Sequence, residues 1–268
     1  MKFFVINRGD DISKELTEKF RKGAADLNLI EDEESPDIVV SIGGDGTLLH
    51  AFHRYSEIVE QVYFVGVHTG HLGFFADWKA NEMYELLHRM AAAKELEPLA
   101  VQYPLAKVEV KTTDRTLIYH ALNEVTIKGA EVTLVAQVDI NDNLFEMFRG
   151  DGICISTPSG STAYNKSLGG AIIHPSLPSI QIAEIASINN RVFRTLGSSL
   201  ILPKHHHCDI YPREGQKILL SVDHLQFHHN DIVSIRGSVS DRKVRFIRFR
   251  PFPFWQRVKE AFVGTVET

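Results

Sequence analysis

The fold of this chain is decided by the segment Ile38-Val39-Val40-Ser41-Ile42-Gly43-Gly44-Asp45-Gly46-Thr47-Leu48-Leu49. An apolar run, a glycine turn and a second apolar run predict a strand, a tight turn and the start of a helix. Glycines let a phosphate approach the backbone, and the first N–H groups of a helix point toward such an anion. Phosphate repels a carboxylate, so we expect Asp45 to have a chemical role: orienting a hydroxyl, taking its proton or helping to hold a metal. The alternative is that Asp45 merely caps the helix.

Strands and helices alternate over residues 1–100. The predicted strands are 3–7, 38–42 and 62–67, and the predicted helices are 12–29, 47–55 and 80–93. This order is typical of a Rossmann-like parallel α/β sheet, which binds ligands at the carboxyl ends of its strands. The glycine turns at Gly43 and at His68–Phe74 both follow strands, so we expect them to line one crevice.

The pattern changes after Pro104 to runs typical of antiparallel β-structure. The predicted strands are 105–110, 117–128, 133–140, 152–156, 180–188, 200–202, 218–222, 232–235 and 244–249, with one helix over 161–171. We therefore expect an α/β domain over 1–100 and a β-rich domain over 101–250. Residues 251–268, with a final helix at about 257–262, are expected to pack back on the first domain.

Composition limits the classes of function. The chain has 268 residues, 44% of them hydrophobic and 24% charged, as in ordinary globular proteins. A net charge of −5 argues against nucleic acid as a partner, although the alternating basic stretch 242–250 predicts a strand with one basic face. Two cysteines, Cys154 and Cys208, are typical of a reducing compartment. With no apolar run of signal-peptide or membrane-spanning length, we expect a cytosolic protein without a membrane partner.

Two polar stretches interrupt the second half. Asn123 and Glu124 lie side by side in an apolar run, and adjacent strand residues face opposite ways, so one of them is expected to point inward. A buried polar group without a partner is costly, which favours a ligand or a hydrogen bond there. The alternative is a strand-end turn with both groups solvated.

The second stretch comprises Arg149-Gly150-Asp151-Gly152 and then Thr157–Ser167, with hydroxyls, a glycine turn and a helix start. It can offer amides to phosphate, hydroxyls to ribose, and the Tyr164 ring as a stacking face. An ordinary Ser/Thr-capped loop is the alternative.

The histidines are weaker indicators of a functional site than these two polar stretches. Those at 205–207 and 228–229 are adjacent rather than spaced to converge, so we expect no zinc site. His224 either enters a cleft or is a hydrogen-bonded structural residue. The sequence has no Walker loop, no GxGxxG after a strand and no GxSxG, which argues against the usual NTPases, dehydrogenases and hydrolases.

Taken together, the motifs resemble those of the bacterial NAD kinases. GGDGT, Asn123-Glu124 and Thr157–Tyr164 are similar to the three signatures of that family, in the same order. The segments 68–74 and 246–255 also resemble it, so the similarity covers nearly the whole chain. GGDGT alone is shared with diacylglycerol and sphingosine kinases and with phosphofructokinase, but Asn-Glu followed by TPSGSTAYN is not expected there.

The resemblance implies transfer of the γ-phosphate of ATP, or of polyphosphate in some members, to the 2′-hydroxyl of the adenosine ribose of NAD. It implies that Asp45 activates this hydroxyl and that Gly43, Gly44 and Gly46 approach the phosphates. The implied contacts to NAD are Asn123, Thr162, Ala163 and Tyr164 for adenosine, Glu124 for ribose hydroxyls, Asp151, Ala186, Arg149 and His224 for the rest, and Phe74 and Ser167 as walls.

The same resemblance implies a divalent cation, Mg²⁺ carried with ATP, in place of a Walker lysine. No cluster of carboxylates predicts a metal site built by the protein itself. Family members are homo-oligomers, so a dimer or tetramer is expected.

Two rival functions stay open at this point. A lipid or sugar kinase with the same loop predicts an apolar groove or sugar-binding acids in place of Asn123-Glu124. A silent dinucleotide sensor would bind NAD without turnover, and the intact Asp45 argues against it. The sequence leaves open ATP against polyphosphate, NAD against NADH, and control by NADP.

Overall fold

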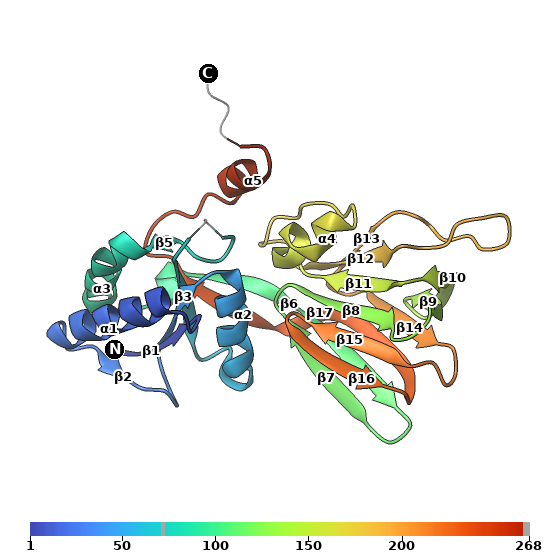
Figure 1. Cartoon of the computed structure of the whole chain (residues 1–268), viewed down its shortest axis with the longest axis horizontal. Coiled ribbons are helices and arrows are strands. Elements are labelled where there is room, and N and C mark those ends of the chain that lie inside the picture. The colour runs from blue at the N-terminus through green and yellow to red at the C-terminus, as the bar shows by residue number, and fades with distance from the viewer. Residues whose placement is uncertain (71–72, 265–268) are drawn as a thin grey trace. The chain divides into compact units, whose positions relative to one another are not determined.

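The computed structural model describes residues 1–70 and 73–264 and divides into two compact units. The first unit contains residues 1–102 and the chain from 243 onward, and the second contains residues 103–242 (Figure 1). His71 and Leu72 of the second predicted glycine turn, and residues 265–268 of the predicted returning tail, lie outside the described residues.

The first unit is built on a parallel sheet. Its strands follow the order β2 (Ile30–Glu31), β1 (Lys2–Asn7), β3 (Ile38–Gly43) and β4 (Tyr63–His68), and β5 (Trp78–Lys79) also pairs with β4. Every residue of β3 and β4 is buried, as their continuous apolar runs predict for a parallel sheet covered on both faces. The Rossmann-like sheet expected for this part of the chain is confirmed.

Helices pack on the strands of this sheet: α1 (Asp11–Asp26), α2 (Asp45–Arg54) and α3 (Met83–Ala92). A further helix, α5 (Phe254–Phe262), contacts the segment 73–76 instead. Short 3₁₀ turns lie at Ser56–Ile58, Ala80–Glu82 and Glu97–Leu99. The Asp10 carboxylate caps α1 by accepting the Ser13 N–H at 2.8 Å, and the helix buries Phe20 against Phe3. Among the described residues, no helix combines the length and the apolar character needed to cross a membrane.

The second unit contains two antiparallel sheets. One has the order β10 (Asn143–Gly150), β9 (Leu134–Ile140), β14 (His207–Pro212) and β17 (Ile232–Ile247), with β6 (Ala100–Thr112) paired to β7 (Thr116–Ala121). The other has the order β13 (Leu200–Pro203), β12 (Ser179–Ile185), β11 (Gly152–Ser156), β8 (Glu124–Gly129), β15 (Ile218–Val222) and β16 (Leu225–His229). Alternating apolar side chains of both sheets form one core, which confirms the β-rich domain.

Several predicted elements were wrong in detail. The predicted strand 117–128 is two strands, β7 and β8, because the chain breaks at Leu122-Asn123. The Asp223 carboxylate makes this break by accepting the N–H groups of Leu122, Asn123 and Glu124 at 3.0, 2.7 and 3.1 Å. The predicted strands 232–235 and 244–249 are the single strand β17, and β10, β14 and β16 were not predicted.

The helix predicted over 161–171 was also wrong. A 3₁₀ turn at Ser159–Thr162 leads into the short helix α4 (Tyr164–Ser167), which ends before Gly169. Gly169 has φ +77°, a conformation in which glycine ends a helix without strain. The stretch 242–250 was predicted to be one strand, but β17 ends at Ile247. Three of its arginines, Arg245, Arg248 and Arg250, form ion pairs with Glu97, Asp77 and Glu82 respectively.

Candidate active site

Asp45 is the first residue of α2, at the carboxyl end of β3. Its carboxylate accepts hydrogen bonds from the backbone N–H groups of Phe74 at 2.8 Å and Phe75 at 3.2 Å. The alternative that Asp45 caps α2 is wrong, because the N-cap residue is Gly44 and no side chain caps the helix. The carboxylate is instead held by a neighbouring segment of the first unit.

Burial raises the pKa of Asp45 above its ordinary value of 3.8, while the two backbone hydrogen bonds and the charges of Arg257 and His68 act in the opposite direction. A carboxylate with a raised pKa is a stronger proton acceptor than one in water. Its environment therefore suits a general base.

The glycines next to Asp45 leave open space. A Cβ added at Gly44 or Gly46 would meet no atom within 4 Å. Both glycines line a cavity of about 280 Å³ together with Asn7, Arg8, Thr47 and His50. Gly43 differs from them because its Cβ would come within 2.9 Å of Thr47 Cβ, so packing against Thr47 requires this glycine.

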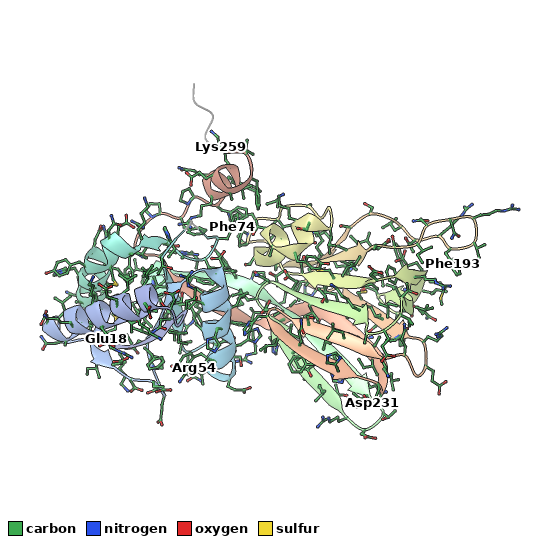
Figure 2. The ribbon with its side chains drawn as sticks, viewed as in Figure 1. Glu18, Arg54, Phe74, Phe193, Asp231 and Lys259 are labelled. Atoms are coloured by element: carbon green, nitrogen blue, oxygen red, sulfur yellow. The ribbon has the colours of Figure 1, made fainter. Side chains whose placement is uncertain are left out.

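Phe74 lies on the segment that holds Asp45. Its half-buried ring stacks on Phe262 of α5 at a centroid distance of 5.6 Å and lies 6.4 Å from Phe254. In Figure 2 the labelled Phe74 lies below the helix that carries Lys259. The expectation that the end of the chain packs on the first domain is thus confirmed for α5.

Asn123 and Glu124 lie where the chain leaves β7 and enters β8 in the second unit. Asn123 is 8% exposed, and its Oδ1 and Glu124 Oε2 are buried without a hydrogen-bond partner among the described residues. The alternative of a solvated strand-end turn is therefore half right, since the position is a strand end but the polar atoms are not solvated.

The pKa of Glu124 is raised to about 8, first by burial and then by the nearby charge of Asp223, against a smaller lowering by the Tyr164 N–H. Glu124 is consequently protonated at neutral pH in the unliganded protein. A protonated carboxyl group can donate a hydrogen bond as well as accept one.

The segment Thr157–Ser167 packs directly on Asn123. The Thr157 hydroxyl donates to the Leu122 carbonyl at 2.6 Å, and the Thr157 N–H donates to the Asn123 carbonyl at 2.8 Å. A Cβ on Gly160 would lie 2.7 Å from Asn123 Cα, so only glycine allows this approach. Two motifs that are far apart in the sequence thus form one polar cluster, with buried unpaired polar atoms on Ser156, Ser159 and Asn165 in the described part of the chain.

Tyr164 lies at the edge of this cluster. Its half-buried ring packs on Cys154, Ala183 and Ile185, and Lys128 Nζ lies 3.4 Å from its hydroxyl. Tyr164 and Asp151 line the same cavity of about 440 Å³. Asp151 and Tyr164 therefore lie at one cavity, although their positions in the sequence did not require this.

The remaining predicted residues of the second unit are more scattered. Thr162 and Ala163 are half-buried just before α4, whereas Ser167, Ala186 and His224 are exposed. Ala186 has φ +46° directly after β12, and Arg149 of β10 lies 4.8 Å from the Phe193 ring centroid. None of these residues is among the described residues that line the 440 Å³ cavity.

Sequence reasoning missed Asp223 as the residue that shapes the Asn123-Glu124 break. Its φ of +51° and its position in the turn between β15 and β16 aim the carboxylate at three backbone amides. Aspartate tolerates this left-handed conformation better than most residues, so the Val-Asp-His turn was the available signal.

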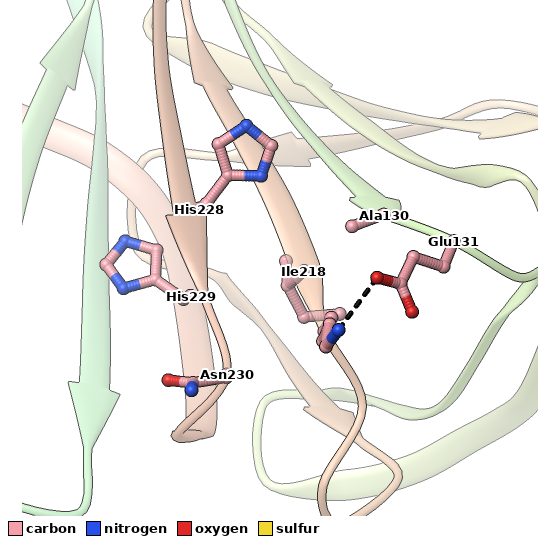
Figure 3. A pocket seen from close by; sticks show the side chains of 7 residues that line it. Ala130, Glu131, Ile218, His228, His229 and Asn230 are labelled. Atoms are coloured by element: carbon pink, nitrogen blue, oxygen red, sulfur yellow. Dashed lines mark hydrogen bonds and ion pairs between the residues drawn. The ribbon is translucent and has the colours of Figure 1, made fainter.

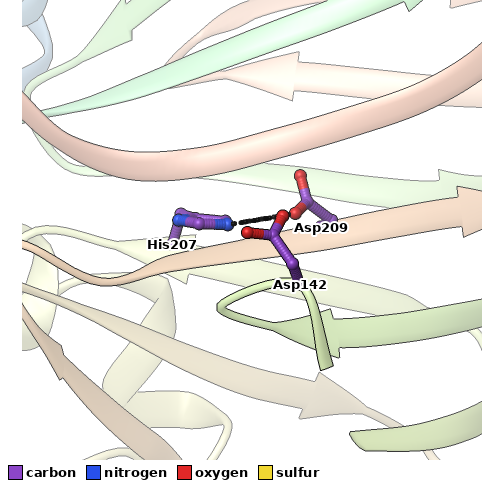
Figure 4. Close-up of side chains that lie close together, drawn as sticks. All are labelled: Asp142, His207 and Asp209. Carbon is purple, nitrogen blue, oxygen red and sulfur yellow. Dashed lines mark hydrogen bonds and ion pairs between the residues drawn. The ribbon is translucent and has the colours of Figure 1, made fainter. Parts of the chain in front are cut away.

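Two other clusters lie in the second unit. A cavity of about 420 Å³ is lined by His228, His229 and the ion pair of Lys217 with Glu131 (Figure 3). His207 Nε2 lies 3.2 Å from Asp142 Oδ1 and 3.4 Å from Asp209 Oδ2 (Figure 4).

The cluster of Asp142, His207 and Asp209 consists of groups that can bind metals, and the expectation of no zinc site did not foresee it. However, Arg236 donates to both Asp209 oxygens at 2.6 and 2.8 Å and to Asp142 at 3.0 Å. The guanidinium already supplies the positive charge, so we interpret the cluster as a structural ion-pair network.

Comparisons with known proteins agree on one family. The chain matches the ATP-NAD kinase N-terminal domain over residues 13–95 and the ATP-NAD kinase C-terminal domain over residues 122–249. It is 55% identical to NAD kinase 1 of Bacillus subtilis (strain 168), covering 100% of both chains. It is 57% identical to an NAD kinase of Lysinibacillus sphaericus, covering 98% of this chain and 99% of the relative.

Solved structures share the fold. A yeast NADH kinase complexed with NADH has a TM-score of 0.81 at 19% identity, over 100% of this chain and 89% of the other. An NAD kinase from Archaeoglobus fulgidus in complex with ATP has a TM-score of 0.77 at 16% identity, over 99% of this chain and 100% of the other.

Proposed function

Because the chain belongs to the NAD kinase family, and is therefore a kinase that converts NAD to NADP, we propose that Asp45 activates the NAD hydroxyl that accepts the phosphate. The observation that carries this role is the Asp45 carboxylate held by two N–H groups, with its pKa raised by burial, beside two open glycines. The 2′-hydroxyl oxygen of the adenosine ribose attacks the γ-phosphorus of ATP while its proton passes to Asp45. The bond from the γ-phosphorus to the bridging oxygen breaks, and ADP leaves.

In this proposal the donor phosphates enter the 280 Å³ cavity beside Gly44 and Gly46. The open glycines, the first turn of α2 and the Arg8 side chain support an anion at this place. A Mg²⁺ ion carried by ATP would neutralise phosphate charge when bound. Among the described residues, the only group of three or more His, Cys, Asp or Glu side chains close enough to share a metal ion is the cluster paired with Arg236. We therefore propose that the nucleotide's own oxygens supply ligands to the cation.

For the acceptor, we propose that the adenosine of NAD binds to the polar cluster of the second unit. The buried, unpaired Asn123 Oδ1 and Glu124 Oε2 support this, because a ligand would supply their missing hydrogen bonds. Tyr164 offers its ring to a base beside the 440 Å³ cavity. The further contacts in the proposal are Thr162, Ala163, Arg149, Asp151, Ser167, Ala186, His224 and Phe74.

We also propose that the protein is a homo-oligomer in the cytosol. Three large apolar side chains on β10 are exposed, Leu144 by 62%, Phe145 by 44% and Met147 by 55%, and a second copy would cover them. Both cysteines are free and buried, as suits a reducing compartment. Sedimentation velocity tests the oligomeric state, and a monomer at micromolar concentration would contradict it.

The test of the catalytic role is Asp45→Asn in a coupled assay that measures NADP formed from NAD, ATP and Mg²⁺. An amide keeps the shape but cannot take the proton, so kcat should fall by at least about 10²-fold while the affinity for NAD changes little. Asp11→Asn is the matched control, because Asp11 is likewise the first residue of a helix, α1, but is exposed.

Near-normal kcat for Asp45→Asn, measured where chemistry limits the rate, would reject Asp45 as the base. The same assay addresses the rivals: a silent sensor binds NAD without forming NADP, and a lipid or sugar kinase phosphorylates another alcohol.

A further inference from the structure

We propose that Arg257 of α5 is a positioning residue for Asp45, acting through the peptide groups of the segment Gly73–Ala76. This inference rests on the proposed role of Asp45 as the base. All the residues involved belong to the first unit.

The Arg257 guanidinium grips the segment at both ends. Its Nη1 donates to the Gly73 carbonyl and to the Ala76 carbonyl, each at 2.7 Å. The N–H groups of Phe74 and Phe75, which lie between those carbonyls, donate to the Asp45 carboxylate. One short segment therefore has a guanidinium bound to its carbonyls and a carboxylate bound to its amides.

Peptide planarity connects the two ends. The Gly73 carbonyl and the Phe74 N–H belong to the same planar peptide group and point in opposite directions. When Arg257 fixes the direction of this carbonyl, it also fixes the direction of the N–H that donates to Asp45 Oδ2 at 2.8 Å. A hydrogen bond at one end of a peptide group also polarises the other end and strengthens the bond made there.

The guanidinium is itself held firmly. Arg257 is 9% exposed, lies 4.2 Å from the Phe252 ring centroid and has its Nη2 3.8 Å from Asp77 Oδ1. Asp77 is paired with Arg248, whose Nη1 also lies 3.4 Å from the Phe75 carbonyl. Since Asp77 is already paired, the short hydrogen bonds of Arg257 go to the backbone carbonyls of the segment.

The positive charge of Arg257 also favours the ionised form of Asp45, in addition to positioning its hydrogen-bond donors. This charge lowers the pKa of Asp45 against the effect of burial, and the interaction of Asp45 with His68 acts in the same direction. Asp77, Arg248, Asp45 and Arg250 are the charged groups that act on Arg257 itself. Loss of Arg257 should therefore raise the pKa of Asp45, so that a higher pH is needed to form the base.

The experiment compares Arg257→Met, Arg257→Lys and Arg250→Met in the NADP-forming assay from pH 5 to pH 9. Arg250 is the matched control, because it lies on the same C-terminal segment but donates to Glu82 and to the Asp77 carbonyl. For Arg257→Met we expect kcat to fall about 10- to 100-fold, the scale of a misplaced catalytic group, with both KM values within about threefold. In Arg257→Met the acid limb of the kcat profile should also move to higher pH. Arg257→Lys keeps the positive charge, so its kcat and its acid limb should lie between those of the wild type and those of Arg257→Met.

A second readout does not depend on activity. In protein labelled with ¹⁵N-phenylalanine, the Phe74 and Phe75 amides should exchange with solvent faster in Arg257→Met than in Arg250→Met. Millimolar guanidinium should partly restore kcat to Arg257→Ala, whereas the same concentration of sodium chloride should not.

A folded Arg257→Met variant with normal kcat, an unmoved acid limb and unchanged exchange would overturn the inference. If Arg257→Met does not fold, Arg257→Lys decides, because normal kcat and exchange in that variant would equally overturn it. Asp45→Asn in the same series separates the two proposals: if it keeps its kcat, the base assignment fails, and if only Arg257→Met keeps its kcat, the positioning role fails.

Discussion

Replacing Gly73 by alanine tests the placement of Asp45 with a single methyl group. The Cβ of this alanine would lie 2.6 Å from Asp45 Cγ and 2.8 Å from Oδ2, and closer still to Oδ1. Ordinary contact begins at about 3.4 Å, so Cγ has to move by at least about 0.8 Å. A displacement of about 1 Å at a reacting group can cost about 10²-fold in rate, so kcat should fall by roughly that factor.

Gly70→Ala is the matched control, since Gly70 lies three residues before Gly73 and its Cβ would meet no atom within 4 Å. Stopped-flow measurement of the first turnover with saturating NAD and ATP isolates chemistry from product release. If folded Gly73→Ala keeps its single-turnover rate within about threefold of normal, the carboxylate tolerates this displacement and the reasoning from its geometry is refuted.

Three further predictions concern the two units separately. Gly46→Ala should stabilise α2 by up to about 1 kcal/mol through helix propensity, yet raise KM for ATP because the methyl group enters the proposed phosphate site. Tyr164→Phe should keep most affinity for NAD in titration calorimetry, whereas Tyr164→Ala should lose about 1–3 kcal/mol of binding free energy, the scale of base stacking. The free energy of unfolding should fall as pH rises from about 4.5 to about 8, because native Glu124 keeps a proton that the unfolded chain releases, and Glu124→Gln should flatten this slope in urea titrations.

Each of these predictions has a clear contrary result. An unchanged KM for ATP in Gly46→Ala would remove phosphate from that cavity. A large loss of melting temperature with normal NAD affinity in Tyr164→Ala would make Tyr164 a core residue only. Equal pH slopes in the wild type and Glu124→Gln would mean that Glu124 titrates normally.

The sequence predicted well where the signals are adjacent in the chain. The apolar run, the glycines and the helix start from Ile38 to Leu49 lie next to one another, and the structure has β3, the turn and α2 there. The alternation of strands and helices around them predicted the parallel sheet, because the spacing of apolar residues within each segment is enough to identify it as a strand or a helix.

Prediction failed where a residue distant in the sequence determines where a strand begins or ends. The break between β7 and β8 is made by the Asp223 carboxylate, which is about one hundred residues away in the chain, so residues 117–128 alone look like one strand. Strand β14 begins in a run of histidines and was missed because its apolar positions face a core built by other segments. The contacts of Arg257 with Gly73 and Ala76 had no local signal at all.

The discontinuity of the first unit has a consequence for synthesis on the ribosome. The amides that hold Asp45 are translated early, but Arg257 and the end of β17, where Phe246 pairs with Phe64, follow only after all of residues 103–242. At bacterial and eukaryotic elongation rates, that stretch takes on the order of ten seconds to make. The first unit therefore cannot complete its sheet, or form the hydrogen bonds from Arg257 to the Gly73 and Ala76 carbonyls, until the second unit has been translated. A chain released before Arg257 would lack those hydrogen bonds.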